Sequence, residues 1–432
     1  MQDLLSFDKA PPFAAPLRFF LTAPLFALAA STVLVIAGPD ALSSRWSPAL
    51  LAATHLVTIG FMLQIMLGAL IQILPVVAGA NLAQPLAVAR WLHAGLSAGA
   101  ALLAAGFLLG KPVFLAAAAA LLAVSVGGFL LAAGQALAGV PTTSPTIRGL
   151  KLALLGLAGA VGLGCLLALG LAFGWVLPLV ELTDLHAGWA LGAWAGVLLA
   201  AMAYVVVPMF QLTPGYPARP SWAFPVVVLA LVLAWSVAVA LGSTALARLA
   251  QGVAALAGIA FAALTLRLQG RGRRARPDTT YRCWQFGLVS AILACAMLST
   301  AALWPGAGEL AFWSPLFGVL LLAGGFVSFI VGMLYKIVPF LAWMHLQHLG
   351  GGRVAAPTMN KILGEPDMRR QVRTHFAAVG LLLAATILPE WLARPAGALL
   401  VLASGWLFHN LFAAFRRYRS HAADIERRLA AP

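Results

Sequence analysis

The sequence predicts an all-α polytopic membrane protein with about twelve transmembrane helices in three pseudo-repeated four-helix units. Three observations lead to this fold class. Hydrophobic residues make up 62% of the 432 residues and charged residues only 9%, far below the roughly 25% charged content of a soluble domain. The apolar residues gather in runs of about 20 residues, the length of a helix that crosses a bilayer. A short motif at the end of such a run also recurs at a nearly constant interval.

Twelve apolar runs predict the spans, because a segment in lipid must satisfy its backbone hydrogen bonds internally as a helix. Glycine, proline and charged residues mark the breaks between the runs. The first run follows an acidic segment, whereas a signal peptide has a basic leader, so this run is interpreted as the first span. The predicted spans are 17–37, 49–78, 91–109, 113–136, 150–173, 185–211, 222–241, 246–266, 284–304, 313–344, 374–389 and 395–415.

The basic residues predict how the spans are oriented. With the amino terminus placed in the cytoplasm, the cytoplasmic segments hold 22 of the 27 Lys and Arg residues and the outer loops hold 4, while Lys336 lies inside an apolar run. Such a bias favours the cytoplasmic side for the basic loops. We therefore expect a single transmembrane domain over residues 1–432 in a bacterial inner (cytoplasmic) membrane, with both termini cytoplasmic. The formal net charge of +15 comes from these loops and does not indicate a nucleic-acid partner.

A motif near the cytoplasmic end of three spans predicts an internal repeat. Pro75, Pro208 and Pro339 each follow branched apolar residues and have a small residue seven positions earlier. Proline is common at helix termini in general, but intervals of 133 and 131 residues, each holding four predicted helices, are typical of a repeat architecture. The predicted pseudo-repeats are about 1–148, 149–280 and 281–432.

Two histidines occupy equivalent positions in two of these units. His55 and His186 lie 20 and 22 residues before Pro75 and Pro208, which places both about one turn into the membrane from the outer face. An ionisable side chain at that depth is costly and marks a candidate site. Neutral histidine is also the commonest metal ligand. The alternative is that each histidine is a capping or interfacial residue.

Further candidate ligands accompany this pair. Met62 and Met66 follow His55 at +7 and +11 and share its face in a regular α-helix. Imidazole and thioether groups together suit copper(I) or heme iron, so heme and/or copper are the predicted cofactors. The alternative for the methionines is a lipid-facing position. His409, in the middle of the last span, is expected to be buried against a backbone carbonyl, with a ligand role as the alternative.

His345 and His348 end the tenth span and are interpreted as interfacial residues, with a metal or heme site at the inner face as the alternative.

Lys336 is expected either to extend towards the headgroups or to form part of a proton or anion path. The other members of such a polar path would be Tyr204, Tyr335 and Gln72. Gln72 is expected to face protein or a cavity, because amides rarely face lipid.

The architecture resembles the catalytic subunit I of heme-copper oxidases and nitric oxide reductases, and more closely the smaller NnrS type of heme-copper membrane protein. The residues that carry the resemblance are the histidines of the second and sixth spans and the string His55-Leu-Val-Thr-Ile-Gly60. The resemblance implies that His55 is an axial heme ligand and that His186 lies on the helix of the first copper ligand. The spans at 222–241 and 313–330 lack the family's other ligand histidines, so the standard oxygen-reducing or nitric oxide-reducing centre is not expected.

The predicted function is a heme- and/or copper-binding membrane protein in respiratory support, metal handling or nitric oxide tolerance. Whether it is an enzyme stays open. A metal-free transporter that bends at the proline-broken ends of spans two, six and ten is the first alternative. The second is a structural or assembly subunit whose basic loops, Arg267–Arg282 and Arg353–Arg373, bind a cytoplasmic partner or anionic lipid.

Overall fold

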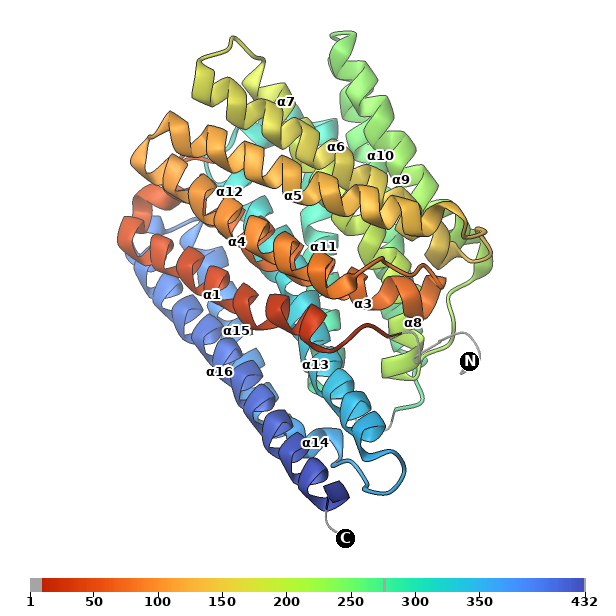
Figure 1. The fold of residues 1–432 in the computed structure, drawn as a ribbon. Helices are drawn as coiled ribbons and strands as arrows, with labels where there is room; N and C mark the ends of the chain where they lie inside the picture. The colour runs from red at the N-terminus through yellow and green to blue at the C-terminus, as the bar shows by residue number, and fades with distance from the viewer. Residues whose placement is uncertain (1–9, 275–276, 431–432) are drawn as a thin grey trace.

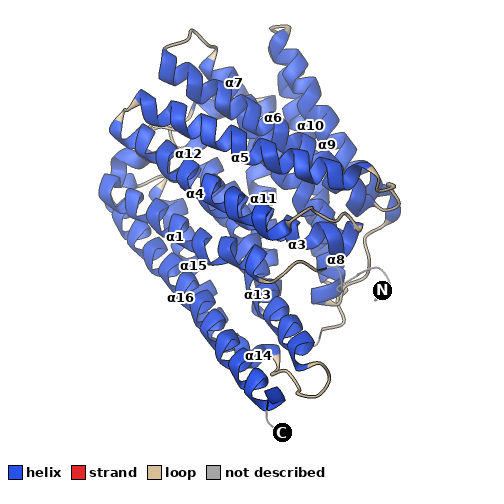
Figure 2. Ribbon diagram, in the orientation of Figure 1, coloured by secondary structure: helices blue, strands red, loops and turns tan. Residues whose placement is uncertain are grey.

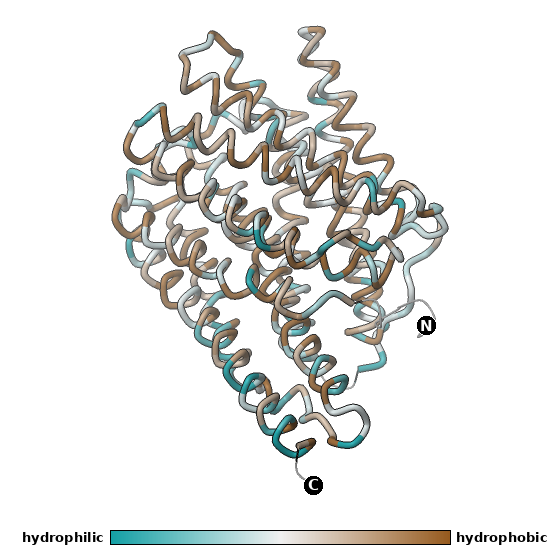
Figure 3. Tube along the Cα trace, viewed as in Figure 1, coloured by the Kyte–Doolittle hydropathy of each residue, from teal (hydrophilic) through white to brown (hydrophobic). Residues whose placement is uncertain are grey.

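The chain is an all-helical membrane bundle. A computed structural model describes residues 10–274 and 277–430, and these residues form helices joined by short loops, with no strand among them (Figure 2). Eleven of the helical segments in this part of the chain are long and apolar enough to cross a membrane. The trace is mostly apolar along the bundle and becomes hydrophilic towards the carboxyl end of the last helix (Figure 3). The predicted fold class, an all-α polytopic membrane protein, is confirmed.

The helices follow the predicted order and nearly the predicted bounds. Several begin with proline in the first turn, where its fixed φ suits a helix start. The long helices are α1 (Ala14–Ala37), α2–η4–α3 (Pro48–Ala78), α4 (Pro85–Leu109), α5 (Pro112–Ala138), α6 (Pro145–Phe173), α7–η5–α8 (Leu179–Gln211), α9 (Ala218–Ala240), α10 (Thr244–Gln269), α11 (Thr279–Leu303), α12–η7–α13 (Trp313–Gly350), α15 (Glu365–Ala385) and α16 (Pro389–Ala430). Shorter helices are Gly38–Leu42, Pro305–Glu309 and α14 (Met359–Ile362).

The last two helices differ most from their predicted spans: α16 begins at Pro389 and continues to Ala430, beyond the predicted 395–415, and the eleventh helix is shifted from 374–389. Helix α15 begins at Glu365 and ends at Ala385, and its first half holds five charged residues between positions 365 and 373. Those charges are the reason why it is not among the eleven apolar spans. Helix α15 packs along α16, and α16 packs along α1 (Figure 1). The two ends of the chain therefore close the bundle side by side.

The prolines of the repeated motif do not end their helices. Pro75 lies inside α3, Pro208 inside α8 and Pro339 inside α13, and α13 continues to Gly350. Helices α3 and α8 end three residues after their prolines, and a hinge role of the three prolines stays a prediction. Proline removes one backbone donor, but neighbouring helices and local adjustment allow a membrane helix to continue past it.

Three of the long helices contain a π-helical segment. These segments are η4 (Leu56–Leu63), η5 (Gly188–Gly196) and η7 (Val319–Phe326). They begin 132 and 131 residues apart, which agrees with the interval between the three prolines. π-Helical turns within α-helices often occur at functional sites. The recurrence is consistent with a threefold pattern, while the boundaries of the three units stay a prediction.

Helix α6 lies directly on the backbone of η5. A Cβ atom added at Gly156 would be 2.3 Å from the backbone carbonyl carbon and oxygen of Ala193, so only glycine fits there. Ala160 and Gly164 follow at intervals of four residues and continue the same face of α6. Small residues at this spacing let membrane helices approach closely. This contact brings the α6 backbone beside the last turn of α7, where His186 lies.

Candidate metal centre

The structure brings His55 and His186 together. His55 is the last residue of α2, immediately before η4, and His186 lies in the last turn of α7, two residues before η5. Although the two residues are 131 positions apart, their ring centroids are 6.4 Å apart and their ring planes differ by 18°. Both side chains are half-buried. The end of the bundle where α2 and α7 begin is called the histidine end below.

Backbone carbonyl groups fix the tautomer of each ring. His55 Nδ1 lies 2.8 Å from the carbonyl oxygen of Leu51, and His186 Nδ1 lies 3.0 Å from that of Ala160 on α6. A carbonyl oxygen only accepts, so each Nδ1 carries the hydrogen and donates it. In a neutral imidazole the lone pair is then on Nε2. A histidine whose Nδ1 donates to a carbonyl is the usual arrangement for a metal ligand.

Small and aromatic residues shape the surroundings of the pair. A Cβ atom added at Gly164 would lie 2.9 Å from His186 Cε1, so this glycine leaves the space that the imidazole fills. The ring of Phe107 on α4 lies 5.3 Å from that of His55. An ion pair between Arg45 and Asp184 ties the segment before α2 to α7. The two histidine-bearing helices are therefore held together from the solvent side as well as through α6.

The two Nε2 atoms of His55 and His186 are a suitable pair of donors for a metal that takes few ligands from the protein. Two imidazole nitrogens that bind one ion from opposite sides at about 2 Å would place their ring centroids about 6 Å apart, and the stacked rings of His55 and His186 lie 6.4 Å apart. Within residues 10–274 and 277–430 no group of three or more His, Cys, Asp and Glu side chains has the arrangement of a metal site. A pair of neutral nitrogen ligands suits copper(I) or the axial positions of heme iron better than a hard cation such as Mg²⁺.

Met62 and Met66 do not share the face of His55 as expected. The expectation assumed a regular α-helix, but η4 covers Leu56–Leu63. A π-helix forms i→i+5 hydrogen bonds and takes more residues per turn, so a residue at +7 does not return to the same face. Met62 is only 2% exposed and lies in the main apolar core, and Met66 packs against that core.

The other histidines named from the sequence lie away from this pair. His409 is exposed on α16, so the expectation that it is buried was wrong: it lies on the outward face of this helix. His345 Nδ1 is 2.9 Å from the hydroxyl of Tyr418, and His348 is exposed. The interfacial interpretation of His345 and His348 stays a prediction. A ligand role for any of the three stays an untested prediction.

Lys336 has a defined partner at the opposite end of the bundle, which is called the basic end below. Its Nζ donates to Asp278 Oδ2 at 2.7 Å, and Arg274 contacts the same carboxylate. Asp278 also caps α11 by accepting from the backbone N–H of Tyr281 at 2.9 Å. Burial raises the pKa of Asp278, but the hydrogen bonds from Lys336 and Tyr281 and the charges of Lys336 and Arg274 lower it below its ordinary value overall.

The proposed members of the polar path lie in separate surroundings. Tyr335 donates to Gln371 Oε1 at 2.9 Å and accepts from Asn410 Nδ2 at 3.0 Å, in a buried network of α13, α15 and α16. Tyr204 instead packs against Tyr216, with ring centroids 5.1 Å apart. Its hydroxyl has no hydrogen-bond partner among the described residues.

Gln72 is buried as expected, at 6% exposure, and in the described part of the chain its Oε1 atom lacks a hydrogen-bond partner. The contacts of the described side chains therefore do not join Gln72, Tyr204, Tyr335 and Lys336 into one path.

Three features of the site were not identified from the sequence. The α6 face with Gly156, Ala160 and Gly164 has a signal that can be read, namely small residues every fourth position. Asp278 also has one, because an aspartate just before an apolar helix is a typical N-cap. The π-helical segments have no comparable signal, since no residue pattern distinguishes them from an α-helix.

No protein-family model matches the sequence, and a search among curated proteins finds no match.

Proposed function

We propose that the protein binds copper(I) or heme iron through the Nε2 atoms of His55 and His186. One observation carries this proposal: two histidines from distant spans lie 6.4 Å apart, each with Nδ1 held by a backbone carbonyl. This arrangement leaves a neutral nitrogen lone pair on each of two neighbouring, half-buried rings. A capping role would use only the Nδ1 atoms, whereas a shared metal ion would use both Nε2 atoms and would account for the two rings lying together.

The residues around the pair have roles that follow from their contacts. Leu51 and Ala160 fix the tautomers through their carbonyl oxygens, and Gly164 leaves room for the ring of His186. A bound copper or heme iron would supply one-electron redox chemistry or binding of a small gas molecule. By the resemblance described above, the biological role is respiratory support, metal handling or nitric oxide tolerance. The predicted orientation places the site near the periplasmic face of a bacterial inner membrane.

The transporter alternative has less support. It uses Pro75, Pro208 and Pro339 as hinges, and each of these prolines lies inside a helix that continues past it. It also relied on a polar path through Lys336, Gln72 and Tyr335, and Lys336 forms an ion pair with Asp278.

The proposal is tested on protein purified in detergent, by elemental analysis and an optical spectrum. The wild type is expected to retain, or to take up on loading, a stoichiometric amount of metal. His55→Ala and His186→Ala should each lower metal affinity by more than about 100-fold, because each removes one of two ligands. His409→Ala is the matched control and should keep the metal. A Soret band that disappears in the two variants identifies heme, and copper without such a band identifies a copper site. Equal metal content in the wild type and both site variants would contradict the proposal.

A further inference from the structure

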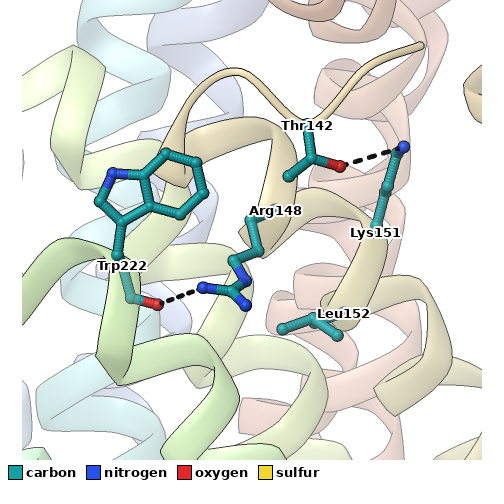
Figure 4. Close-up of a pocket in the computed structure, with 5 residues that line it drawn as sticks. All are labelled: Thr142, Arg148, Lys151, Leu152 and Trp222. Carbon is teal, nitrogen blue, oxygen red and sulfur yellow. Dashed lines mark hydrogen bonds between the residues drawn. The ribbon is translucent and has the colours of Figure 1, made fainter.

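A hollow lined by basic residues lies at the basic end of the bundle, where α6 and α9 begin (Figure 4). Its volume is about 410 Å³. The loop between α5 and α6 covers one side, and the first turn of α9 forms the other. The residues that line it are Thr142, Arg148, Lys151, Leu152 and Trp222.

Neutral groups hold both cations of this hollow in place. Arg148 Nη1 donates to the carbonyl oxygen of Trp222 at 3.3 Å, and its guanidinium lies 5.5 Å from the centre of the Trp222 ring. Lys151 Nζ donates to the carbonyl oxygen of Val140 at 2.6 Å and to Thr142 Oγ1 at 3.3 Å. Within the described ranges, no carboxylate lies within 4.0 Å of either cation. The hollow therefore presents two positioned positive charges that the protein does not compensate.

A second hollow, of about 530 Å³, adjoins the first and shares Arg148 and Trp222 with it. It continues along the surface of α9 past Val226 and Val227, whose side chains are 39% and 40% exposed. Arg219 also lines it. A cationic region thus adjoins a shallow apolar surface on the outside of a membrane span, which matches the polarity of a lipid headgroup and the start of its acyl chain.

We infer that these two hollows form one binding site for an anionic phospholipid. The phosphate would lie between Arg148 and Lys151, and one acyl chain would follow α9 along Val226 and Val227. Trp222 would lie at the boundary, where tryptophan is commonly found in membrane proteins. Basic pockets between helices at a membrane surface are typical sites for anionic headgroups. A zwitterionic lipid would bring its own cation towards two fixed positive charges, and free phosphate would leave the apolar surface uncovered.

This site is independent of the proposed metal centre. Arg148 and Gly164 are sixteen residues apart on α6, which corresponds to about 24 Å along a helix. Loss of lipid binding and loss of metal binding are therefore separate outcomes.

The test measures thermal stability in a neutral detergent while phosphatidylglycerol, phosphatidylcholine or inorganic phosphate is added. Phosphatidylglycerol should raise the Tm of the wild type in a saturable way, whereas the other two should leave it nearly unchanged. In the double variant R148Q/K151Q the lipid-induced shift should fall by more than half. The matched control K111Q/R248Q removes two exposed cations that begin other helices and should respond like the wild type.

A second measurement does not depend on the variant being folded. Photoactivatable phosphatidylglycerol is cross-linked to wild-type protein in detergent, and the labelled peptides are mapped. Adducts should concentrate on the segment of α9 that contains Val226 and Val227. Adducts absent from that segment would overturn the inference. So would an equal shift with phosphatidylcholine, an unchanged shift in the double variant, or a full shift with inorganic phosphate alone, which indicates an anion site without a lipid.

Discussion

At the histidine end of the bundle, His55 and His186 each use one ring nitrogen for a carbonyl group and keep the other available. At the basic end, Asp278 forms ion pairs with Lys336 and Arg274 and also accepts from a backbone N–H group. Both clusters join helices that are far apart in the sequence, and both contain titratable side chains. They differ in whether the protein itself completes the interactions of those side chains.

This difference separates a stabilising cluster from a candidate ligand site. Around Asp278 the positive and negative groups are partners of one another, so the cluster holds α11 and α13 together and needs no further ligand. Around the histidine pair the described contacts satisfy the Nδ1 atoms only, and the two rings lie 6.4 Å apart. Changes at the basic end should therefore alter stability, and changes at the histidine end should alter metal binding.

The largest effect on stability is expected from Asp278→Asn. This change keeps a helix-capping side chain but removes the charge that pairs with Lys336 and Arg274, so we expect a loss of about 2 kcal/mol. The apparent Tm in detergent should fall, while metal binding at His55 and His186 should be unaffected. The exposed ion-pair residue Asp424 provides the control, because D424N should change the Tm very little. An equal loss of metal in D278N would remove the distinction between the two ends.

The pH dependence of stability is the next effect. The pKa of Asp278 in the folded protein lies below its ordinary value, so its stabilising contribution is complete above the unfolded-state pKa of about 3.9. The contribution is lost as the pH falls through the lower, folded-state pKa. The difference in Tm between the wild type and D278N should therefore be largest near neutral pH and should shrink as the pH is lowered below about 4. A difference that grows on acidification would contradict this assignment.

A smaller effect is expected from Gly164→Ala. The new methyl group would lie 2.9 Å from His186 Cε1, so the imidazole must move away from its present position. We expect metal affinity to fall by about 10-fold, comparable to a change in the surroundings of a ligand, with little change in helix content. Gly162→Ala on the same helix has open space around the added methyl group. If both variants bind metal equally well, the position of the His186 ring is not important for the site.

The smallest effect is expected from Arg45→Gln. Arg45 and Asp184 are 33% and 39% exposed, and ion pairs of such exposure contribute about 0–1 kcal/mol. Metal affinity should fall by only a few-fold, and the difference from the wild type should decrease at high salt. A change comparable to that of His186→Ala would show that the ion pair, rather than the histidine, holds the site together.

The fold was largely predictable because each span must satisfy its own backbone hydrogen bonds, which makes hydrophobicity and length sufficient signals. The helices at Glu365–Ala385 and Pro389–Ala430 were the exceptions, since each continues through a charged segment that lies outside its apolar run. The equivalence of His55 and His186 was also readable, because it depends on spacing alone. Their contact was not, since it depends on how η5 packs against α6.

The remaining errors concerned which face of a helix a residue occupies. The predicted face of Met62 and Met66 required α-helical rotation through a segment that is π-helical. The interpretation of His409 as a buried residue required a knowledge of which face of α16 is turned outwards. Neither helix rotation nor helix-to-helix contact can be deduced from an apolar run that is hydrophobic on all sides.

X-ray absorption spectroscopy at the absorption edge of the bound metal tests the central claim most directly, because its fine structure reports which atoms bind the metal. The account predicts imidazole scattering from two histidine nitrogens at about 2 Å in the wild type. It also predicts one imidazole fewer in each of the variants His55→Ala and His186→Ala that still retain metal under saturating conditions. A metal environment without imidazole, or one that is identical in the wild type and both variants, would contradict it.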